Sequence, residues 1–383
     1  MIPHWPTWLV WGFLASLTAV HGGDCFAYFG TYTGAASRGI YVARLDETTG
    51  RLSPAKLAAE TESPSFLAVA PNRHALYAAN EVDHFKDDVT DHGGAITAFG
   101  LDPATGRLTF LNQVCSSGSA PCYVSVDPSG RVVFAANYGS GSVKAFHLAT
   151  NGAIGAAGDC VPRTGHGVNP DRQTSPHAHF ICTDPANRFV LACDLGTDEV
   201  LVYPFDPTAA SLQPAEVSAF SVPPGSGPRH LAFSPNGRFA HVLNEMGCTI
   251  STFAWNATNG TLKLLDTVSA LPPGTTVRPG FTAAEILTTG NFVYTTLRGH
   301  DSVSVFTADP QTGRLQFLQN LPSGGKVPRG MGLDPSTRWL LIGNQASGQV
   351  TEFSRDGQSG RLTATGTELK VGSPVDVKFV TKN

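Results

Sequence analysis

An arginine and a glutamate that lie sixteen residues apart form the pair whose residue types and spacing best suggest joint chemistry. Arg229 stands just before the short apolar run LAF, and Glu245 stands just after a second run, FAHVL. Both runs have strand length and are bounded by turn formers, so they predict an antiparallel hairpin. Because the start of one strand and the end of its partner lie at one edge, the two side chains are expected to be neighbours. A carboxylate can accept a proton, and a guanidinium can hold a carboxylate or phosphate in a forked geometry.

The same pattern of strand, turn and strand recurs along the chain. The copies begin at Pro64, Pro121, Pro176, Pro228, Gly280 and Pro328. Each copy is followed by a third strand, a turn rich in Gly, Asn or Thr, and a fourth strand, as in DSVSVFTADPQTGRL. A period of about 50 residues with roughly four strands per unit is typical of β-propeller blades.

The two ends of the chain complement each other. Residues 27–52 supply strands two to four of a blade without a first strand, and SPVDVKFV near the C-terminus supplies a first strand alone. If both belong to one blade, the ring closes without a free sheet edge. We therefore predict one all-β domain over residues 24–383, a seven-bladed β-propeller of four-stranded antiparallel blades, closed by N- and C-terminal strands that share one blade. Two stacked β-sandwiches would not explain why the ends are complementary.

In a propeller, the entrance of each innermost strand and the connection after the second strand face one mouth of the central channel. The framework repeats from copy to copy, whereas the residues at these two places vary. The residues that we expect to gather there are His177 or His179, Arg229, Glu245, Glu285, Arg298, Arg329 and Asn137. His177 is preferred over His179 because Pro176 aligns with Pro228, which puts His177 in the place of Arg229. Each of these side chains could instead be a packing residue or part of a framework ion pair.

Composition and charge exclude several classes of protein. Charged residues make up only 15% of the chain, the net charge is −4 and no basic run is present, so nucleic acid is not an expected partner. The 41 Gly and 27 Pro residues suit an all-β protein with many tight turns. No CxxC pair occurs, so we expect no zinc site, and no other metal or cofactor is indicated. The polar insertion EVDHFKDDVTDHGG is interpreted as a solvated loop rather than as a cation site.

The seven cysteines are an odd number, so at least one is unpaired. Cys182 and Cys193 fall on the two strands of one predicted hairpin. They could form a disulfide in an oxidising compartment, or both could be small buried hydrophobic residues.

Residues 1–23 predict a secretory signal peptide. The apolar stretch from Leu9 to Val20 is too short to span a bilayer but fits the hydrophobic region of a leader. One feature argues against this interpretation, because no Lys or Arg precedes Arg38. We predict a secreted or extracytoplasmic protein that is free of the membrane after leader removal, with a cytoplasmic location as the alternative.

Several long stretches, in order, resemble the lactonase family of seven-bladed propellers. This family includes bacterial 6-phosphogluconolactonase of the propeller type and the fungal carboxy-cis,cis-muconate cyclase. The resemblance covers residues 28–380 and rests on FGTYT, ANYGSGSV, RQTSPHAH, DLGTDEVLVY, GSGPRHLAFSPNGRFAHVLNE and RGHDSVSVF. It implies a site at the channel mouth with a catalytic histidine at His177 or His179. It also implies that Arg229, Glu245 and Arg298 take part.

The function that this resemblance implies is hydrolysis of a small anionic sugar lactone. Glu245 or His177 would activate water, and the arginines would hold the anion or stabilise the developing oxyanion. We assign catalytic roles to His177, Arg229, Glu245 and Arg298, and substrate binding to His179, Glu285, Arg329 and Asn137. No serine stands in a GxSxG elbow, so a covalent acyl-enzyme is not indicated. The alternatives are a lactonising isomerase of the muconate cyclase type and a non-catalytic propeller that binds a ligand or a protein, and no oligomeric state is predicted.

Overall fold

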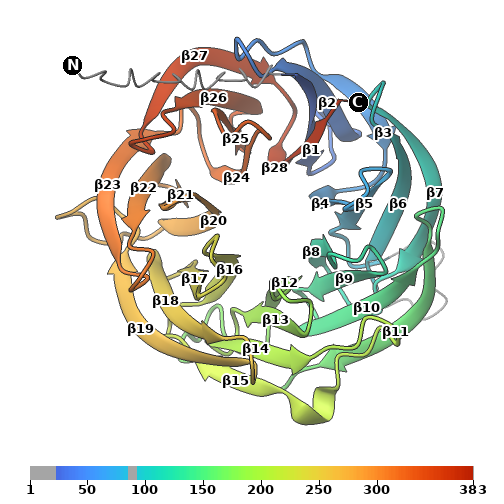
Figure 1. Cartoon of the computed structure of the whole chain (residues 1–383), viewed down its shortest axis with the longest axis vertical. Helices are drawn as coiled ribbons and strands as arrows, with labels where there is room; N and C mark the ends of the chain where they lie inside the picture. The colour runs from blue at the N-terminus through green and yellow to red at the C-terminus, as the bar shows by residue number, and fades with distance from the viewer. Residues whose placement is uncertain (1–22, 85–92, 383) are drawn as a thin grey trace, which may run out of the picture.

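The computed structural model describes residues 23–84 and 93–382, and in these ranges the chain forms seven four-stranded antiparallel sheets. The sheets are arranged as blades around one central axis (Figure 1). The predicted seven-bladed β-propeller is therefore confirmed. No helix in the described ranges is long and apolar enough to cross a bilayer. The predicted signal peptide lies outside these ranges except for Gly23, as does most of the polar insertion.

Six blades are continuous in sequence. Blade 1 comprises β4 (Pro64–Val69), β5 (Ala75–Asn80), β6 (Ala95–Asp102) and β7 (Arg107–Cys115). Blade 2 comprises β8 (Pro121–Val126), β9 (Val132–Asn137), β10 (Ser142–Leu148) and β11 (Ile154–Pro162). Blade 3 comprises β12 (Ala178–Thr183), β13 (Phe189–Asp194), β14 (Glu199–Pro204) and β15 (Ser218–Ser221), with the 3-10 helix η1 (Pro214–Glu216) before its last strand.

Blade 4 comprises β16 (Pro228–Phe233), β17 (Phe239–Asn244), β18 (Thr249–Asn256) and β19 (Thr261–Ser269). Blade 5 comprises β20 (Thr282–Thr289), β21 (Phe292–Arg298), β22 (Ser302–Ala308) and β23 (Leu315–Pro322). Blade 6 comprises β24 (Pro328–Leu333), β25 (Trp339–Asn344), β26 (Gln349–Arg355) and β27 (Leu362–Lys370).

Blade 7 joins the two ends of the chain. Its innermost strand is β28 (Pro374–Thr381), which pairs with β1 (Asp24–Thr31), followed by β2 (Gly39–Asp46) and β3 (Lys56–Glu60). The β1–β28 register runs from Cys25 opposite Thr381 to Thr31 opposite Pro374. The prediction that both ends share one blade is confirmed, and this pairing removes the free edge that β1 would otherwise present.

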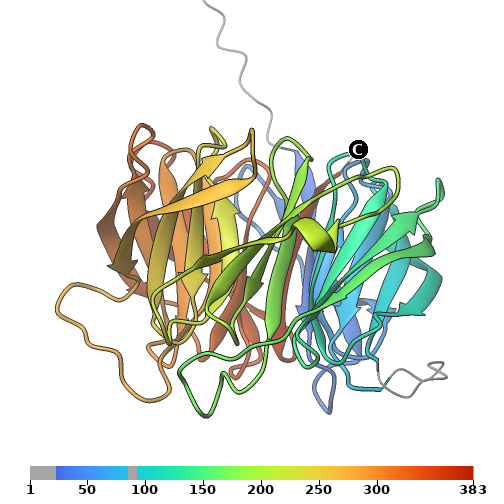
Figure 2. The ribbon, with the colours of Figure 1, turned by 90° about the horizontal axis from the view of Figure 1, so that it is seen from below.

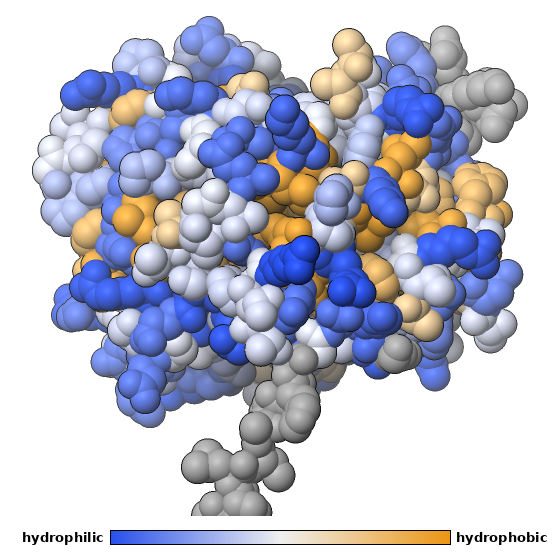
Figure 3. Space-filling model, turned by 90° about the horizontal axis from the view of Figure 1, so that it is seen from above, coloured by the Kyte–Doolittle hydropathy of each residue, from blue (hydrophilic) through white to orange (hydrophobic). Residues whose placement is uncertain are grey.

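The hydrophobic core lies between adjacent blades rather than within any one of them. Second strands such as β5 (ALYAAN) and β17 (FAHVLN) are buried along their whole length, because a neighbouring blade covers each face. Outer strands such as β7 are exposed or half-buried along most of their length. On the side of the ring shown in Figure 3, hydrophobic residues reach the surface in patches separated by hydrophilic ones.

A repeated turn between the third and fourth strands fastens neighbouring blades together. In blade 5, Gly313 adopts a φ of 73° in this turn and faces the ring of Phe239, which begins β17 of blade 4. Gly360 of blade 6 faces Phe292 of blade 5 in the same way, with a φ of 69°. Glycine tolerates both this backbone conformation and so close an approach, which explains why Gly recurs at this place in the turn.

The two faces of the ring differ. Innermost strands begin, and second strands end, at the face that is lower in Figure 2, which we call the mouth face. The long connections 163–177, before β12, and 270–281, before β20, extend from this face. The C-terminal end of β28 lies at the opposite face. The residues gathered at the mouth face therefore come from connections and strand ends of several blades.

Candidate active site

A β-bulge near the start of each innermost strand aims side chains at the central axis. In β16 the register passes from Pro228 to His230, so that Arg229 is the extra residue. The equivalent positions in the other blades are Ser65, Cys122, His179, Ala284, Arg329 and Val375. A bulge interrupts the alternation of a strand, so that the extra residue and its successor can both face the axis.

Glu245 occupies the centre of an arginine cluster at the mouth face. Its Oε2 lies 3.0 Å from Nε of Arg229 and 2.9 Å from Nη2 of Arg298, and its Oε1 lies 2.9 Å from Nη2 of Arg172. Arg298 ends β21, and Arg172 comes from the connection before β12. The predicted neighbourhood of Arg229, Glu245 and Arg298 is therefore observed, and Arg172 joins it.

The electrostatics of this cluster make Glu245 a firmly ionised carboxylate. Glu245 is 4% exposed and Arg229 is 2% exposed. Burial alone would raise the pKa of Glu245, but the guanidiniums of Arg298 and Arg229 hold that pKa well below its usual value. Burial lowers the pKa of Arg298 to about 10, which leaves it charged at neutral pH. Glu245 is thus a weak proton acceptor and a strong partner for cations.

His179, and not His177, occupies the place of Arg229. Ala178 pairs with Asp194 as Pro228 pairs with Asn244, so the prediction that His177 takes the Arg229 position is wrong. Nε2 of His179 lies 4.0 Å from Oε2 of Glu245, which is beyond hydrogen-bonding distance. Burial and the nearby Arg229 hold the pKa of His179 well below 6.5, so its ring is neutral at neutral pH.

Two neighbours fix the positions of the histidine rings. Nδ1 of His179 lies 3.6 Å from Sγ of Cys122, the equivalent residue of blade 2. The ring of His177 stacks on Tyr138 at 4.5 Å, and its Nδ1 lies 2.9 Å from the Tyr138 backbone carbonyl oxygen. His177 is therefore held against the rim by blade 2, while His179 lies beside the carboxylate.

Arg329 belongs to a second cluster at the same face. Its Nη2 lies 4.0 Å from Oε1 of Glu81, and its guanidinium lies 5.3 Å from the centre of the Tyr32 ring. The Tyr32 hydroxyl donates a 2.8 Å hydrogen bond to Oε2 of Glu81. Within the described ranges, no group accepts a hydrogen bond from the Arg329 guanidinium, so its donors are available to a ligand.

Glu285 and Asn137 do not join these clusters. Oε1 of Glu285 lies 2.9 Å from Nδ1 of His230, one residue beyond the Arg229 position. Asn137 donates to Oγ of Ser142 in its own blade at 3.1 Å and to the carbonyl of Ser116, in the connection before that blade, at 3.3 Å. Side-chain amides at the same position of other blades make similar contacts, as in Asn80, Asn244 and Asn344. This asparagine is a framework residue.

An aromatic waist lies further along the axis than the arginine cluster, away from the mouth face, and it consists of Phe66, Tyr123, Phe180 and His230. Phe66 stacks on Tyr123 at 3.9 Å, and Tyr123 lies 4.6 Å from Phe180. Phe66 of blade 1 also lies 5.6 Å from His230 of blade 4, across two intervening blades. These rings therefore narrow the channel on the side of blades 1 to 4.

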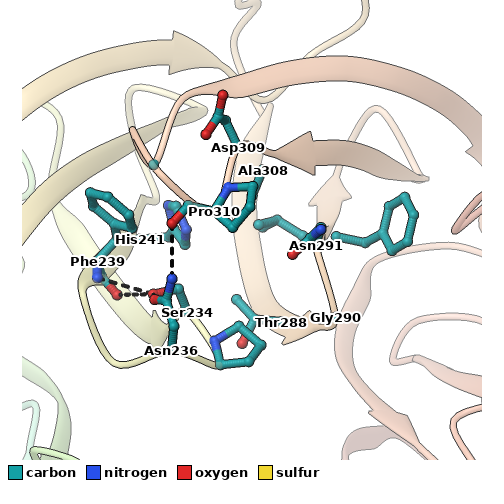
Figure 4. Close-up of a pocket in the computed structure, with 14 residues that line it drawn as sticks. Ser234, Asn236, Phe239, His241, Thr288, Gly290, Asn291, Ala308, Asp309 and Pro310 are labelled. Atoms are coloured by element: carbon teal, nitrogen blue, oxygen red, sulfur yellow. Dashed lines mark hydrogen bonds between the residues drawn. The ribbon is translucent and has the colours of Figure 1, made fainter.

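A pocket of about 130 Å³ lies away from this site, between blades 4 and 5 (Figure 4). Its lining includes Asn236, which donates a 2.9 Å hydrogen bond to the Pro310 carbonyl, and the buried His241. Burial lowers the pKa of His241 to about 4. Nδ1 of His241 lies 3.0 Å from Oγ1 of Thr252, but Nε2 has no partner. The pocket shares no residue with the arginine cluster.

Within the part of the chain that the structure describes, the cysteines and the acidic residues form no further centre. The seven cysteines all lie in the described ranges, and no disulfide joins any two of them. Cys182 pairs with Leu191 and Cys193 pairs with Phe180, so the two thiols are diagonal rather than opposite neighbours. This separation is too large for the disulfide that the sequence left open, and both side chains are packing residues. Among residues 23–84 and 93–382, no group of three or more His, Cys, Asp or Glu side chains is placed to hold a metal ion.

Comparisons with known proteins agree on one family. The family model described as "Lactonase, 7-bladed beta-propeller" matches residues 26–379. The 6-phosphogluconolactonase of Bacillus subtilis is 35% identical over 353 residues, which cover 92% of this chain and 97% of that protein. The 6-phosphogluconolactonase of Formosa agariphila is 30% identical over 353 residues, covering 90% and 96%. The solved structure of a periplasmic gluconolactonase from Pseudomonas aeruginosa has a TM-score of 0.84 and 33% identity, covering 94% of this chain and all of that one.

Proposed function

Because the chain belongs to the lactonase family of seven-bladed β-propellers, we propose that it hydrolyses an anionic sugar lactone of the 6-phosphogluconolactone class at the mouth face. Lactone hydrolysis is supported by the relatives named 6-phosphogluconolactonase and gluconolactonase. Those names differ in whether the lactone carries a phosphate. The charges at the mouth face bear on that difference.

The observation that favours an anionic substrate is an excess of positive charge at the mouth face. The two clusters contain four guanidiniums, those of Arg172, Arg229, Arg298 and Arg329, but only two carboxylates, Glu81 and Glu245. Two positive charges are therefore left uncompensated. A phosphate monoester carries about −1.5 to −2 charges at neutral pH and accepts several hydrogen bonds, so it matches this excess.

Arg329 is the arginine best placed to hold that anion. The other three guanidiniums each lie within 3.0 Å of Glu245, which already occupies part of their donor capacity. Arg329 is 4.0 Å from its nearest carboxylate oxygen and donates no hydrogen bond within the described ranges. A ligand phosphate or carboxylate would therefore gain the most from Arg329.

His179 is the general base in this proposal. Its ring is neutral at neutral pH and can accept a proton, whereas both oxygens of Glu245 are already held by three guanidiniums. Water would attack the lactone carbonyl and pass a proton to Nε2 of His179, and Glu245 would stabilise the imidazolium that forms. Guanidinium N–H groups of Arg229 or Arg298 would stabilise the oxyanion. When the ring C–O bond breaks, His179 would return the proton to the departing alkoxide.

The substrate assay compares 6-phosphogluconolactone with unphosphorylated gluconolactone, corrected for spontaneous hydrolysis. We expect Arg329→Met to lower kcat/KM for the phosphorylated lactone by about 10- to 150-fold, the value of a charge-assisted hydrogen bond. The same substitution should change kcat/KM for gluconolactone by less than about threefold. Equal losses with both lactones would remove Arg329 as the anion site. Full activity in His179→Gln would remove the proposed base.

The cyclase alternative and the cellular location stay predictions. Carboxymuconate is also an anion that four arginines could hold, so it belongs in the same assay as a third substrate. We also propose export of the protein, on the signal-like residues 1–23 and on the periplasmic location in the name of the Pseudomonas aeruginosa relative. Fractionation of cells that express the full chain tests this, and an uncleaved protein in the cytoplasm would contradict it.

A further inference from the structure

A cavity of about 520 Å³ lies on the central axis beyond the aromatic waist, away from the arginine cluster. Phe66 and Tyr123 of the waist line it, together with Glu285 of β20 and Lys378 of β28. None of the residues assigned to the mouth clusters lines it. The cavity is therefore separate from the site proposed for lactone hydrolysis.

Glu285 supplies this cavity with a buried acceptor that is only half used. The residue is 5% exposed. Its Oε1 lies 2.9 Å from Nδ1 of His230 and accepts a 3.0 Å hydrogen bond from the backbone N–H of Ile286. Oε2 has no hydrogen-bond partner among the described residues. This oxygen is not among the fully enclosed polar atoms that lack a partner, and Glu285 lines the cavity, so Oε2 is available to a ligand or to water there.

Lys378 and Tyr123 add donors to the same cavity. Nζ of Lys378 donates to Oδ1 of Asp376 at 2.5 Å and lies 4.0 Å from the centre of the Phe66 ring. An ammonium group has three N–H donors, so two remain. The Tyr123 hydroxyl makes no hydrogen bond with any described residue and can both donate and accept. One acceptor, one cation and one hydroxyl therefore converge on a wall of aromatic rings.

The mixture of charges selects a neutral ligand. An anion would meet the free oxygen of Glu285, and a cation would meet Lys378. Vicinal hydroxyl groups can donate to the carboxylate and accept from the ammonium at the same time, without adding charge. The stacked pair of Phe66 and Tyr123 offers an apolar wall on which the C–H face of a saturated ring can lie.

We propose that this cavity is a second binding site, distinct from the mouth, and that it binds a neutral cyclic polyol of about hexose size. Glu285 Oε2, the free donors of Lys378 and the Tyr123 hydroxyl contact the ligand hydroxyls, and the rings of Phe66 and Tyr123 contact its apolar face. The proposal does not depend on which lactone is hydrolysed at the mouth.

Methyl β-D-glucopyranoside tests the proposal, because it is neutral and contains no lactone to hydrolyse. Ligand-observed NMR with the full chain should give a Kd of about 1 mM, the affinity typical of a small ligand of this size. Gluconate and glucosamine, which carry a negative and a positive charge, should bind at least about tenfold more weakly. A soaked crystal should place the glucoside beside Glu285 and Lys378.

Variants separate this site from the mouth. Tyr123→Phe keeps the ring and removes only the hydroxyl, and Lys378→Met removes the donors, so each should weaken glucoside binding severalfold. Lys370→Met, on the exposed outer strand β27, is the matched control and should leave binding unchanged, as should Arg329→Met. Circular dichroism checks that each variant is folded. Absence of glucoside binding, displacement of the glucoside by 6-phosphogluconate, or equal binding of the charged analogues would each overturn the proposal.

Discussion

Replacement of Glu245 by Gln removes one negative charge from the arginine cluster and keeps the size of the side chain. Two of its three partners are strongly buried, since the side chains of Arg229 and Arg298 are 3% and 13% exposed. Removal of one member of a buried ion pair leaves an uncompensated charge and costs about 3–5 kcal/mol. Arg172 is 39% exposed, and its contact adds no more than about 1 kcal/mol. We therefore expect Glu245→Gln to lower the free energy of unfolding by about 3–5 kcal/mol.

Urea unfolding at neutral pH, followed by circular dichroism, measures this loss. The matched control is Glu199→Gln, because Glu199 pairs with Arg163 at 3.1 Å where both side chains are about a quarter exposed. That control should lose no more than about 1 kcal/mol. Addition of Arg298→Met to Glu245→Gln should cost less than Arg298→Met costs in the wild-type protein, since the guanidinium has already lost its partner. A loss below about 1 kcal/mol in Glu245→Gln, with an unchanged slope against urea, would refute the view that the cluster is a buried network.

Three further outcomes follow from the same structure. The depressed pKa of Glu245 contributes stability that is present above its usual pKa of 4.5 and is lost as pH falls toward the folded-state pKa. In acid titrations of unfolding, wild-type protein should therefore lose more stability below pH 4.5 than Glu245→Gln does. Because the pKa of His179 lies well below 6.5, kcat/KM should stay level as pH falls to 6.5 and decline only in more acidic buffer. A decline centred above pH 6.5 would exclude His179 as the base. Gly313→Ala would place a Cβ 2.5 Å from Phe239 at a φ of 73°. It should destabilise the fold by about 1–3 kcal/mol, measured by thermal unfolding. Gly357→Ala is the control and should change stability little, because no atom lies within 4 Å of the added Cβ.

The fold could be predicted because its signals are local and repeated. Each blade carries its own turn chemistry, such as the positive-φ glycine of the turn that contains Gly313, and the spacing of the copies sets the number of blades. The complementary chain ends predicted the pairing of β1 with β28, because an incomplete blade would leave buried edges unsatisfied. None of these features depends on contacts between distant side chains.

The site could be predicted only where the hairpin register determines it. Arg229 and Glu245 meet because they lie at the open end of one hairpin, and Arg298 ends the second strand of the next blade. The alignment of Pro176 with Pro228 placed His177 at the Arg229 position, but the structural counterpart of Pro228 is Ala178. The sequence could not reveal this shift, because a one-residue bulge has no characteristic residue types. Arg172 was missed because it lies in a long connection, where no strand pairing determines which residues become neighbours.

The structure places Asn137 and Glu285 outside the mouth clusters, for two different reasons. Asparagine ends the second strand in several copies, as in Asn80, Asn137, Asn244 and Asn344, and such repetition is typical of a framework residue. Glu285 lies one residue further from the mouth than Arg229 because the irregular pairing of β20 spans Ala283 to Ile286. Its partner is therefore His230 and not an arginine of the mouth.

The aromatic waist has a kinetic consequence for the proposed reaction. Since Phe66 and His230 lie 5.6 Å apart across the axis, we expect a lactone bound at the mouth face to leave by the mouth rather than through the ring. Substrate and hydroxy acid must use the same opening, one after the other, and the product carries an additional carboxylate toward the same arginines. The product should therefore be a competitive inhibitor, and its departure against four guanidiniums is the step that higher ionic strength would accelerate.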